Sequence, residues 1–126
     1  MRIGGSMKED LKERTKRFAL AVIKLVDSLP RTQVTMVIGR QLIKASSSVG
    51  ANYRAACRAR SRRDFISRIS IVEEEADESA YWLEMLFALG LVAEKQFLPV
   101  FHEANELTAI FVSSGRTAKS NIGSED

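Results

Sequence analysis

Apolar residues recur at intervals of three and four positions in four segments of the chain, which is the spacing of one face of an α-helix. The first helix is predicted at residues 8–28, before Pro30, and the second at residues 32–58. The apolar stripe of the second segment consists of Val34, Val37, Ile38, Leu42, Ala45, Val49 and Ala56. Gly39 and Gly50 each either weaken this helix by about 1 kcal/mol relative to alanine or allow a neighbouring helix to approach closely.

The third and fourth helices are predicted further along the chain. The third covers residues 61–89: it begins at Ser61, with an acidic residue three positions later much as in a capping box, and ends before Gly90. The fourth covers residues 96–113, where Pro99 is tolerable in the first turn of the helix. No segment alternates between apolar and polar residues as a half-buried strand does, so a sheet is not expected.

Four amphipathic helices with short connections pack most simply as an antiparallel up-down-up-down four-helix bundle. The sequence therefore predicts an all-α protein with a bundle domain at residues 8–113. Residues 1–7 are predicted to be a flexible N-terminus. Residues 114–126 have no apolar periodicity and are predicted to be a disordered tail.

The length of 126 residues suits one domain with one core. The net charge of +3 results from 19 basic and 16 acidic residues, so the distribution of charge, rather than its sum, must indicate any nucleic-acid partner. Cys57 is the only cysteine, which fits a reducing compartment and favours the cytoplasm. The chain lacks both an apolar run of roughly 20 residues and a signal peptide, so neither membrane insertion nor export is expected.

A cluster of arginines lies where the second predicted helix meets the third. Its members are Arg54, Arg58, Arg60, Arg62, Arg63 and Arg68. Gathered at one end of the bundle, they would form a positive surface that contacts phosphates through planar, bidentate groups. The alternative is a solvated helix end whose arginines pair with local acids, and Arg54 and Arg58 also suit the C-terminal dipole of the second helix. Nothing in this pattern supports the recognition of specific bases.

Acidic residues dominate the middle of the third helix, at residues 73–78 and Glu84. Paired carboxylates in bundles can bind metals, but the di-iron pattern requires a Glu-x-x-His motif on each of two helices, and His102 is the only histidine. A solvated or partner-facing acidic surface is therefore favoured, and no metal or cofactor is expected. The sequence also lacks a glycine-rich phosphate loop, a zinc spacing and a nucleophile elbow, so no enzymatic activity is expected.

Three polar residues, Gln41, Ser48 and Asn52, interrupt the apolar stripe of the second helix at intervals of seven and four, which places them on one face. One interpretation is a line of ligand-binding groups. The favoured interpretation is a buried hydrogen-bond network that fixes the register of the helices, with Glu75 or Glu78 of the third helix as a partner.

The third helix carries more apolar residues than its own bundle requires. The additional residues include Tyr81, Trp82, Met85 and Leu89. A helix that is apolar on more than one side contacts more than its bundle neighbours, so these four residues are predicted to form an interface between identical subunits. Because the same helix starts with basic residues and continues with acidic ones, subunits could also pair head to tail through opposite charges.

Several motifs resemble, in their order and spacing, a known family of four-helix bundles. They are Ser28-Leu29-Pro30, Gln41-Leu42-Ile43-Lys44-Ala45-Ser46-Ser47-Ser48-Val49-Gly50-Ala51-Asn52, Arg60-Ser61-Arg62-Arg63-Asp64-Phe65, and then Glu75, Glu78 and Trp82-Leu83. The family includes the proteins encoded in intervening sequences of bacterial large-subunit ribosomal RNA genes, and the resemblance covers about residues 11–112. It implies an up-down bundle, frequently assembled as a ring of five subunits, with no established enzymatic activity.

At the level of the fold, the chain is also similar to the accessory variability proteins of diversity-generating retroelements. This similarity implies basic rings that bind a reverse transcriptase and nucleic acid. After Asn52, the sequence departs from much of the intervening-sequence protein family. The usual acid and glycine are replaced there by Arg54-Ala55-Ala56-Cys57-Arg58. The replacement strengthens the basic character of the turn, although similarity of fold does not by itself establish a function.

Together these features predict a non-catalytic, cytoplasmic homo-oligomer, expected to be a pentamer, that associates with the backbone of RNA or DNA through the arginine cluster. The resemblance suggests a role as an accessory to a mobile element or a reverse transcriptase. The alternative is a protein-interaction module without nucleic-acid binding, whose partner docks around Glu74, Trp82 and Met85. An enzyme would require a pocket that the sequence does not indicate.

Overall fold

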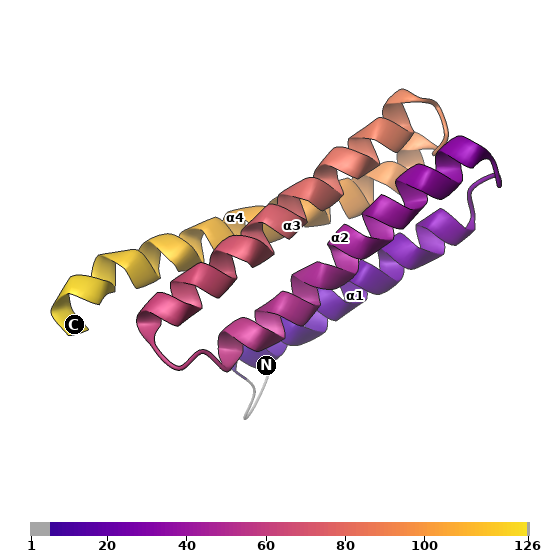
Figure 1. Ribbon diagram of the computed structural model, residues 1–126. Coiled ribbons are helices and arrows are strands. Elements are labelled where there is room, and N and C mark those ends of the chain that lie inside the picture. Colours follow the sequence, from indigo (N-terminus) through magenta and orange to yellow (C-terminus); the bar gives the residue numbers. More distant parts are fainter. Residues whose placement is uncertain (1–5, 126) are drawn as a thin grey trace.

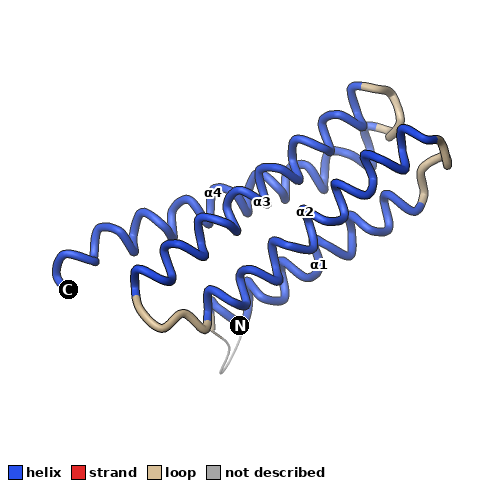
Figure 2. Tube along the Cα trace, in the orientation of Figure 1, coloured by secondary structure: helices blue, strands red, loops and turns tan. Residues whose placement is uncertain are grey.

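The computed structural model describes residues 6–125, and over this range the chain forms four α-helices and no strand (Figure 1). The helices are α1 (Met7–Asp27), α2 (Gln33–Cys57), α3 (Arg62–Ala88) and α4 (Glu94–Glu125). Short turns join them, and each helix packs against the next one along the chain (Figure 2). The predicted all-α four-helix bundle is confirmed, while its assembly into a ring stays a prediction.

The antiparallel order divides the bundle into two distinct ends. The start of α1, the α2–α3 turn and the last turns of α4 lie at one end, which we call the basic end (Figure 1). The α1–α2 turn at residues 28–32 and the α3–α4 turn at residues 89–93 lie at the other, which we call the distal end. Groups far apart in the sequence therefore meet at each end.

Local chemistry determines where the helices begin and end. The hydroxyl groups of Ser6, Thr32 and Ser61 cap α1, α2 and α3 by accepting hydrogen bonds from backbone N–H groups three residues later. Gly90 ends α3 with a φ of 72°, a left-handed conformation that favours glycine. The next N–H donates to the carbonyl of Leu86 at 3.0 Å, which completes a Schellman motif.

The core combines one apolar stripe from each helix, as the periodicity predicts. Val22 and Leu107, for example, have no exposed surface. The prediction is wrong for Val34 and Val37, which are 50% and 52% exposed. Both lie at the distal end of α2, outside the face that turns inward, where Ile38 takes the buried position.

Helices α1 and α2 approach each other closely where α2 has glycine. A Cβ atom at Gly39 would come within 2.8 Å of Val26 Cγ1, and one at Gly50 would lie 3.1 Å from Thr15 Oγ1. The buried Thr15 hydroxyl is satisfied because it donates to backbone carbonyls of its own helix. Of the two roles that the sequence left open for these glycines, the structure therefore supports close helix packing.

The fourth helix extends through the segment predicted to be disordered. That prediction is wrong for residues 114–125, which continue α4 to Glu125. Gly115 lies against Ile69 of α3, at 3.5 Å from a would-be Cβ atom to Cγ2, and Ala118 is only 3% exposed. Small residues at these two core-facing positions thus let α3 cover α4 there, although they give a weak apolar signal in the sequence.

The first residues of α4 and of α1 also differ from the prediction. Helix α4 starts at Glu94, which puts Pro99 in the second turn rather than the first. The carbonyl that loses its donor to this proline belongs to the exposed Lys95, where water can replace the missing N–H. Of the predicted flexible N-terminus, Met7 is already helical, and residues 1–5 lie outside the described residues.

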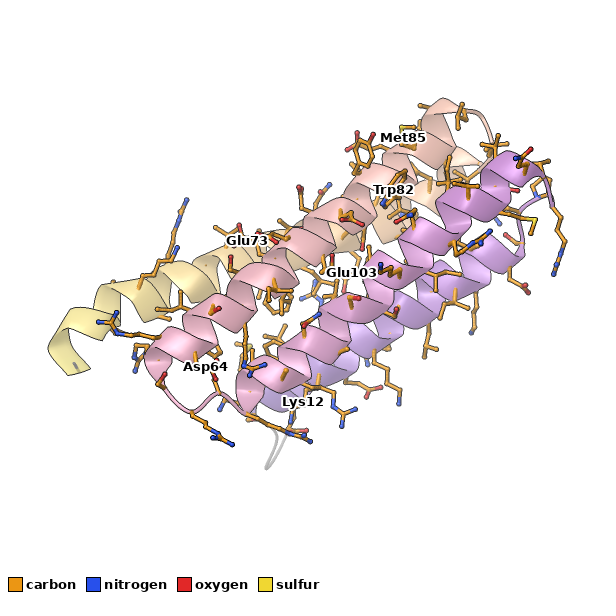
Figure 3. All side chains as sticks on the ribbon, in the orientation of Figure 1. Lys12, Asp64, Glu73, Trp82, Met85 and Glu103 are labelled. Atoms are coloured by element: carbon orange, nitrogen blue, oxygen red, sulfur yellow. The ribbon has the colours of Figure 1, made fainter. Side chains whose placement is uncertain are left out.

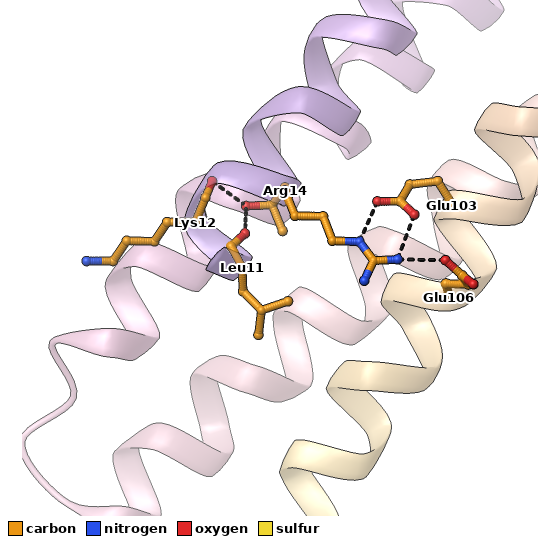
Figure 4. A network of polar contacts seen from close by, with 6 residues as sticks. Leu11, Lys12, Arg14, Glu103 and Glu106 are labelled. Atoms are coloured by element: carbon orange, nitrogen blue, oxygen red, sulfur yellow. Dashed lines mark hydrogen bonds and ion pairs between the residues drawn. The ribbon is translucent and has the colours of Figure 1, made fainter. Parts of the chain in front are cut away.

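A charged cluster closes the bundle between α1 and α4 (Figure 4). Arg14 Nε donates to Glu103 Oε2 at 2.7 Å, and Arg14 Nη2 donates to Glu103 Oε1 at 2.8 Å and to Glu106 Oε2 at 2.6 Å. This hydrogen bonding with Glu103 raises the pKa of Arg14. The bidentate geometry specifies how the last helix lies against the first.

Replacement of Gly39 with alanine should lower the free energy of unfolding by about 1 to 2 kcal/mol, because overpacking against Val26 outweighs the better helix propensity. Urea unfolding would measure this change, and Val26→Ala in the same chain should restore most of it. The matched control is Gly115→Ala, where the new methyl group has ordinary contact distance and should stabilise the protein by up to about 1 kcal/mol. A stabilising Gly39→Ala would contradict the close packing of α1 and α2.

Candidate nucleic-acid interface

The α2–α3 turn gathers the predicted arginine cluster at the basic end of the bundle. We call these six residues the arginine turn: Arg54, Arg58, Arg60, Arg62, Arg63 and Arg68. The first two lie at the end of α2, Arg60 lies in the connection, and the others lie on the first two turns of α3. Arg62 is half-buried and the others are exposed. The structure therefore brings together residues that the sequence grouped by proximity alone.

Asp64 organises the start of α3 within this turn (Figure 3). Its Oδ2 atom accepts a hydrogen bond from the backbone N–H of Arg60 at 3.2 Å, and its Oδ1 atom accepts one from Arg68 Nε at 3.1 Å. The backbone bond, followed by the bond with Arg68, lowers the pKa of Asp64. One carboxylate thus fixes the path of the turn through the backbone of Arg60 and pairs with the side chain of Arg68.

Helix dipoles act differently on the two halves of the arginine turn. Arg54 and Arg58 lie at the C-terminus of α2, where a cation is favourable. Arg62 and Arg63 occupy the first turn of α3, where the helix dipole disfavours positive charge. The helix dipole therefore stabilises the first pair and opposes the second.

Helix α4 adds charge to the same end. Arg116 and Lys119 are exposed on the part of α4 that lies beside the start of α3. An open depression of about 320 Å³ lies where the two helices meet, lined by Arg62, Phe65, Ser113, Ser114, Thr117 and Ala118. Sequence reasoning missed Arg116 and Lys119 because it treated their segment as disordered; the spacing of Phe111, Gly115 and Ala118 was the available signal.

The comparisons with known proteins agree with this architecture. The family model described as 23S rRNA-intervening sequence protein matches residues 8–113. The chain belongs to this family. A crystal structure of a protein of unknown function from the S23 ribosomal protein family of Bacteroides thetaiotaomicron has 30% sequence identity and a TM-score of 0.77, covering 83% of this chain and 97% of that one. No curated protein matches the sequence of this chain.

The predicted resemblance to the intervening-sequence proteins is thus confirmed. The family match includes the whole arginine turn and stops before Arg116 and Lys119. In this member of the family, the basic end therefore combines a turn within the matched region with a helical extension beyond it.

The polar residues of α2 do not form the predicted buried network. Gln41 is exposed, and the amide of Asn52 donates to the backbone carbonyl of Ser48 in its own helix at 2.8 Å. Glu75 is half-buried, and Glu78 is exposed and accepts a hydrogen bond from Trp82 Nε1 at 3.3 Å. The prediction is wrong because these side chains lie beside the inward faces of α2 and α3, and the bonds of Asn52 and Glu78 stay within their own helices.

The predicted subunit interface lies on α3 toward the distal end, away from the arginine turn (Figure 3). Tyr81 and Leu89 are each 52% exposed, and Trp82 and Met85 are half-buried. The Tyr81 and Trp82 rings meet edge to face, with centroids 5.0 Å apart. We call these four residues the α3 apolar face. This exposed apolar surface is therefore separate from the basic end.

Other chemistry has little structural support in the described part of the chain. No group of three or more histidine, cysteine, aspartate or glutamate side chains is arranged to hold a metal ion among residues 6–121. None of the described helices is both long enough and apolar enough to cross a membrane. His102 is exposed, and Cys57 is a half-buried free thiol.

Replacement of Asp64 with asparagine should lower the free energy of unfolding at pH 7, because the neutral side chain loses its ion pair with Arg68 and its favourable charge at the start of α3. The folded-state pKa lies below the ordinary 3.8. The stabilisation is therefore complete above that value and is lost as the pH falls through the folded-state pKa. Urea unfolding at neutral pH and near pH 3 should show a difference between parent and variant that shrinks in acid.

The matched control for this measurement is Asp77→Asn, which changes an exposed carboxylate further along α3. It should have little effect at either pH. A difference for Asp64→Asn that is the same at both pH values would exclude a charge effect.

Proposed function

We propose that this protein is a non-catalytic, homo-oligomeric adaptor of the cytoplasm that binds the phosphate backbone of nucleic acid with its basic end. The observation that carries the proposal is the convergence of the arginine turn with Arg116 and Lys119 of α4. Five arginines and no acidic residue occur at residues 54–63. Arginine offers planar, bidentate hydrogen bonding to phosphate, which suits this role better than a diffuse positive charge.

The geometry favours contact with backbone rather than with base edges. The arginines project from a turn and two helix ends, whereas recognition of duplex sequence normally requires a helix or a β-ribbon that enters the major groove. We therefore propose binding that depends on charge and is tolerant of sequence. The identity of the nucleic acid, and an association with a reverse transcriptase, stay predictions.

Assembly is the second part of the proposal. Exposed Tyr81 and Leu89 are supported by half-buried Trp82 and Met85 on one face of α3, which gives an apolar surface that a second copy can cover. We propose a ring, with five subunits as the resemblance implies. Several basic ends in one assembly would bind a long polyanion with avidity that a single copy lacks.

Replacement of Arg60, Arg62 and Arg63 with alanine should weaken the binding of a mixed-sequence RNA, measured by fluorescence anisotropy from about 50 to 200 mM salt. In the parent, log K should fall linearly with log salt concentration because bound phosphates release counterions. Loss of three phosphate contacts should reduce the magnitude of that slope by about 2 to 3.

The matched control removes three exposed cations from α1 with Lys16→Ala, Arg17→Ala and Lys24→Ala. It has the same net charge as the test variant and should retain most of the binding. Equal losses in the two variants, or parent binding no stronger than that of a charge-matched unrelated protein, would refute the nucleic-acid role. Recovery of one stoichiometric protein partner after nuclease treatment would then support the alternative interaction module on the α3 apolar face.

A further inference from the structure

Charge is segregated between the second and third helices of the bundle. Every charged residue at positions 28–63 is basic, because no aspartate or glutamate occurs between Asp27 and Asp64. Every charged residue at positions 69–94 is acidic, because no lysine or arginine occurs between Arg68 and Lys95. Two neighbouring helices of one chain therefore expose opposite charges along much of their length.

These opposite charges are not paired with each other inside the chain. Arg40 and Lys44 are exposed on α2, and Glu74 and Glu78 are exposed on α3. In the part of the chain that the structure describes, no ion pair joins either cation to these acids, and Glu78 accepts only from Trp82. The two helices thus present complementary surfaces that face solvent.

An apolar groove accompanies the basic surface. It lies between α1 and α2 at the distal end, has a volume of about 400 Å³, and is open to solvent. Its lining includes the apolar Val26, Leu29, Met36 and Ile43, and its charged residues are Arg31, Arg40 and one acid, Asp27. Met36 is 54% exposed, so apolar surface continues out of the groove onto the face of α2. We call this surface the α1–α2 groove.

The exposed side of α2 next to the α1–α2 groove and the exposed side of α3 that carries the α3 apolar face have the same order of apolar and charged residues. On α2, the exposed Val37 lies seven residues from Lys44; on α3, Tyr81 lies seven residues from Glu74. Seven residues correspond to about 10 Å along a helix. In both helices the apolar residue is the one nearer the distal end, and the charged residue is nearer the basic end.

From this correspondence we infer that the α1–α2 groove receives the α3 apolar face of a second copy of the same chain, with Arg40 and Lys44 opposite Glu74 and Glu78. This inference rests on the homo-oligomer of the proposed function. It names the surface of the neighbouring copy that the α3 apolar face contacts. Two different surfaces meet, so the contact is heterologous and can repeat from copy to copy. Apolar residues and charges match in register only when the two bundles stand side by side in the same orientation, which places every arginine turn at one end of the assembly.

Charge reversal on either surface should dissociate the assembly. One variant carries Arg40→Glu and Lys44→Glu, and a second carries Glu74→Lys and Glu78→Lys. Each sets like charges against each other across the interface, and the dissociation constant should rise by at least about 100-fold. Light scattering at micromolar concentration should then give the mass of single chains, while circular dichroism should show that the helices remain.

A variant that restores the opposite charges distinguishes loss of this contact from loss of folding. The chain that carries all four substitutions again has opposite charges on the two surfaces and should recover the parent mass. The matched control, Lys16→Glu with Arg17→Glu, changes net charge by the same amount on α1 and should leave the mass unchanged. An oligomer that persists with Arg40→Glu and Lys44→Glu, or that the fourfold variant fails to restore, would overturn the inference.

The same measurements separate this inference from the proposed function. An oligomer insensitive to the α2 substitutions would leave assembly through α3 intact and refute only the α1–α2 groove as its counterpart. A parent protein that is a single chain would refute both the groove and the proposed assembly. RNA binding by the arginine turn is measured independently, so its loss or retention bears on the proposed function alone.

Discussion

Burial of one apolar stripe from each helix is the constraint on which the other features depend. Four stripes can share a single core only if the helices lie side by side, and the short turns then require that consecutive helices run in opposite directions. Helix α1 packs against α2 through the close approach at Gly39, and it is joined to α4 by the ion pair between Arg14 and Glu103. This arrangement leaves two ends with different chemistry.

The fold brings the residues of the basic end together, because the α2–α3 turn and the last turns of α4 lie at the same end of the bundle. The arginine turn supplies most of its charge, and Asp64 holds the turn in place with a carboxylate whose pKa is lowered by its bonds to Arg60 and Arg68. Arg62 and Arg63 stand where the α3 dipole opposes them. In the proposed function, the phosphates of the ligand would add favourable interactions with these two charges.

Most of the exposed large apolar side chains lie in the half of the bundle near the distal end. Val34, Met36, Tyr81 and Leu89 are each about half exposed there, and the α1–α2 groove opens beside them. Binding of a polyanion and contact between subunits would therefore use separate surfaces of one small domain. Because α2 is basic and α3 is acidic after Arg68, the proposed contact between copies would pair charges that the single chain leaves facing water.

The sequence by itself determined the helices and the core, because a period of 3.6 residues and the signals at Ser61, Pro30 and Gly90 act locally. It also indicated the arginine turn, whose members lie within one short segment. Tertiary structure decided what depends on distant partners. Residues 114–125 are helical because α3 covers Gly115 and Ala118, and Gln41 is exposed because the inward positions of α2 belong to other residues; neither outcome is encoded in the periodicity of one segment.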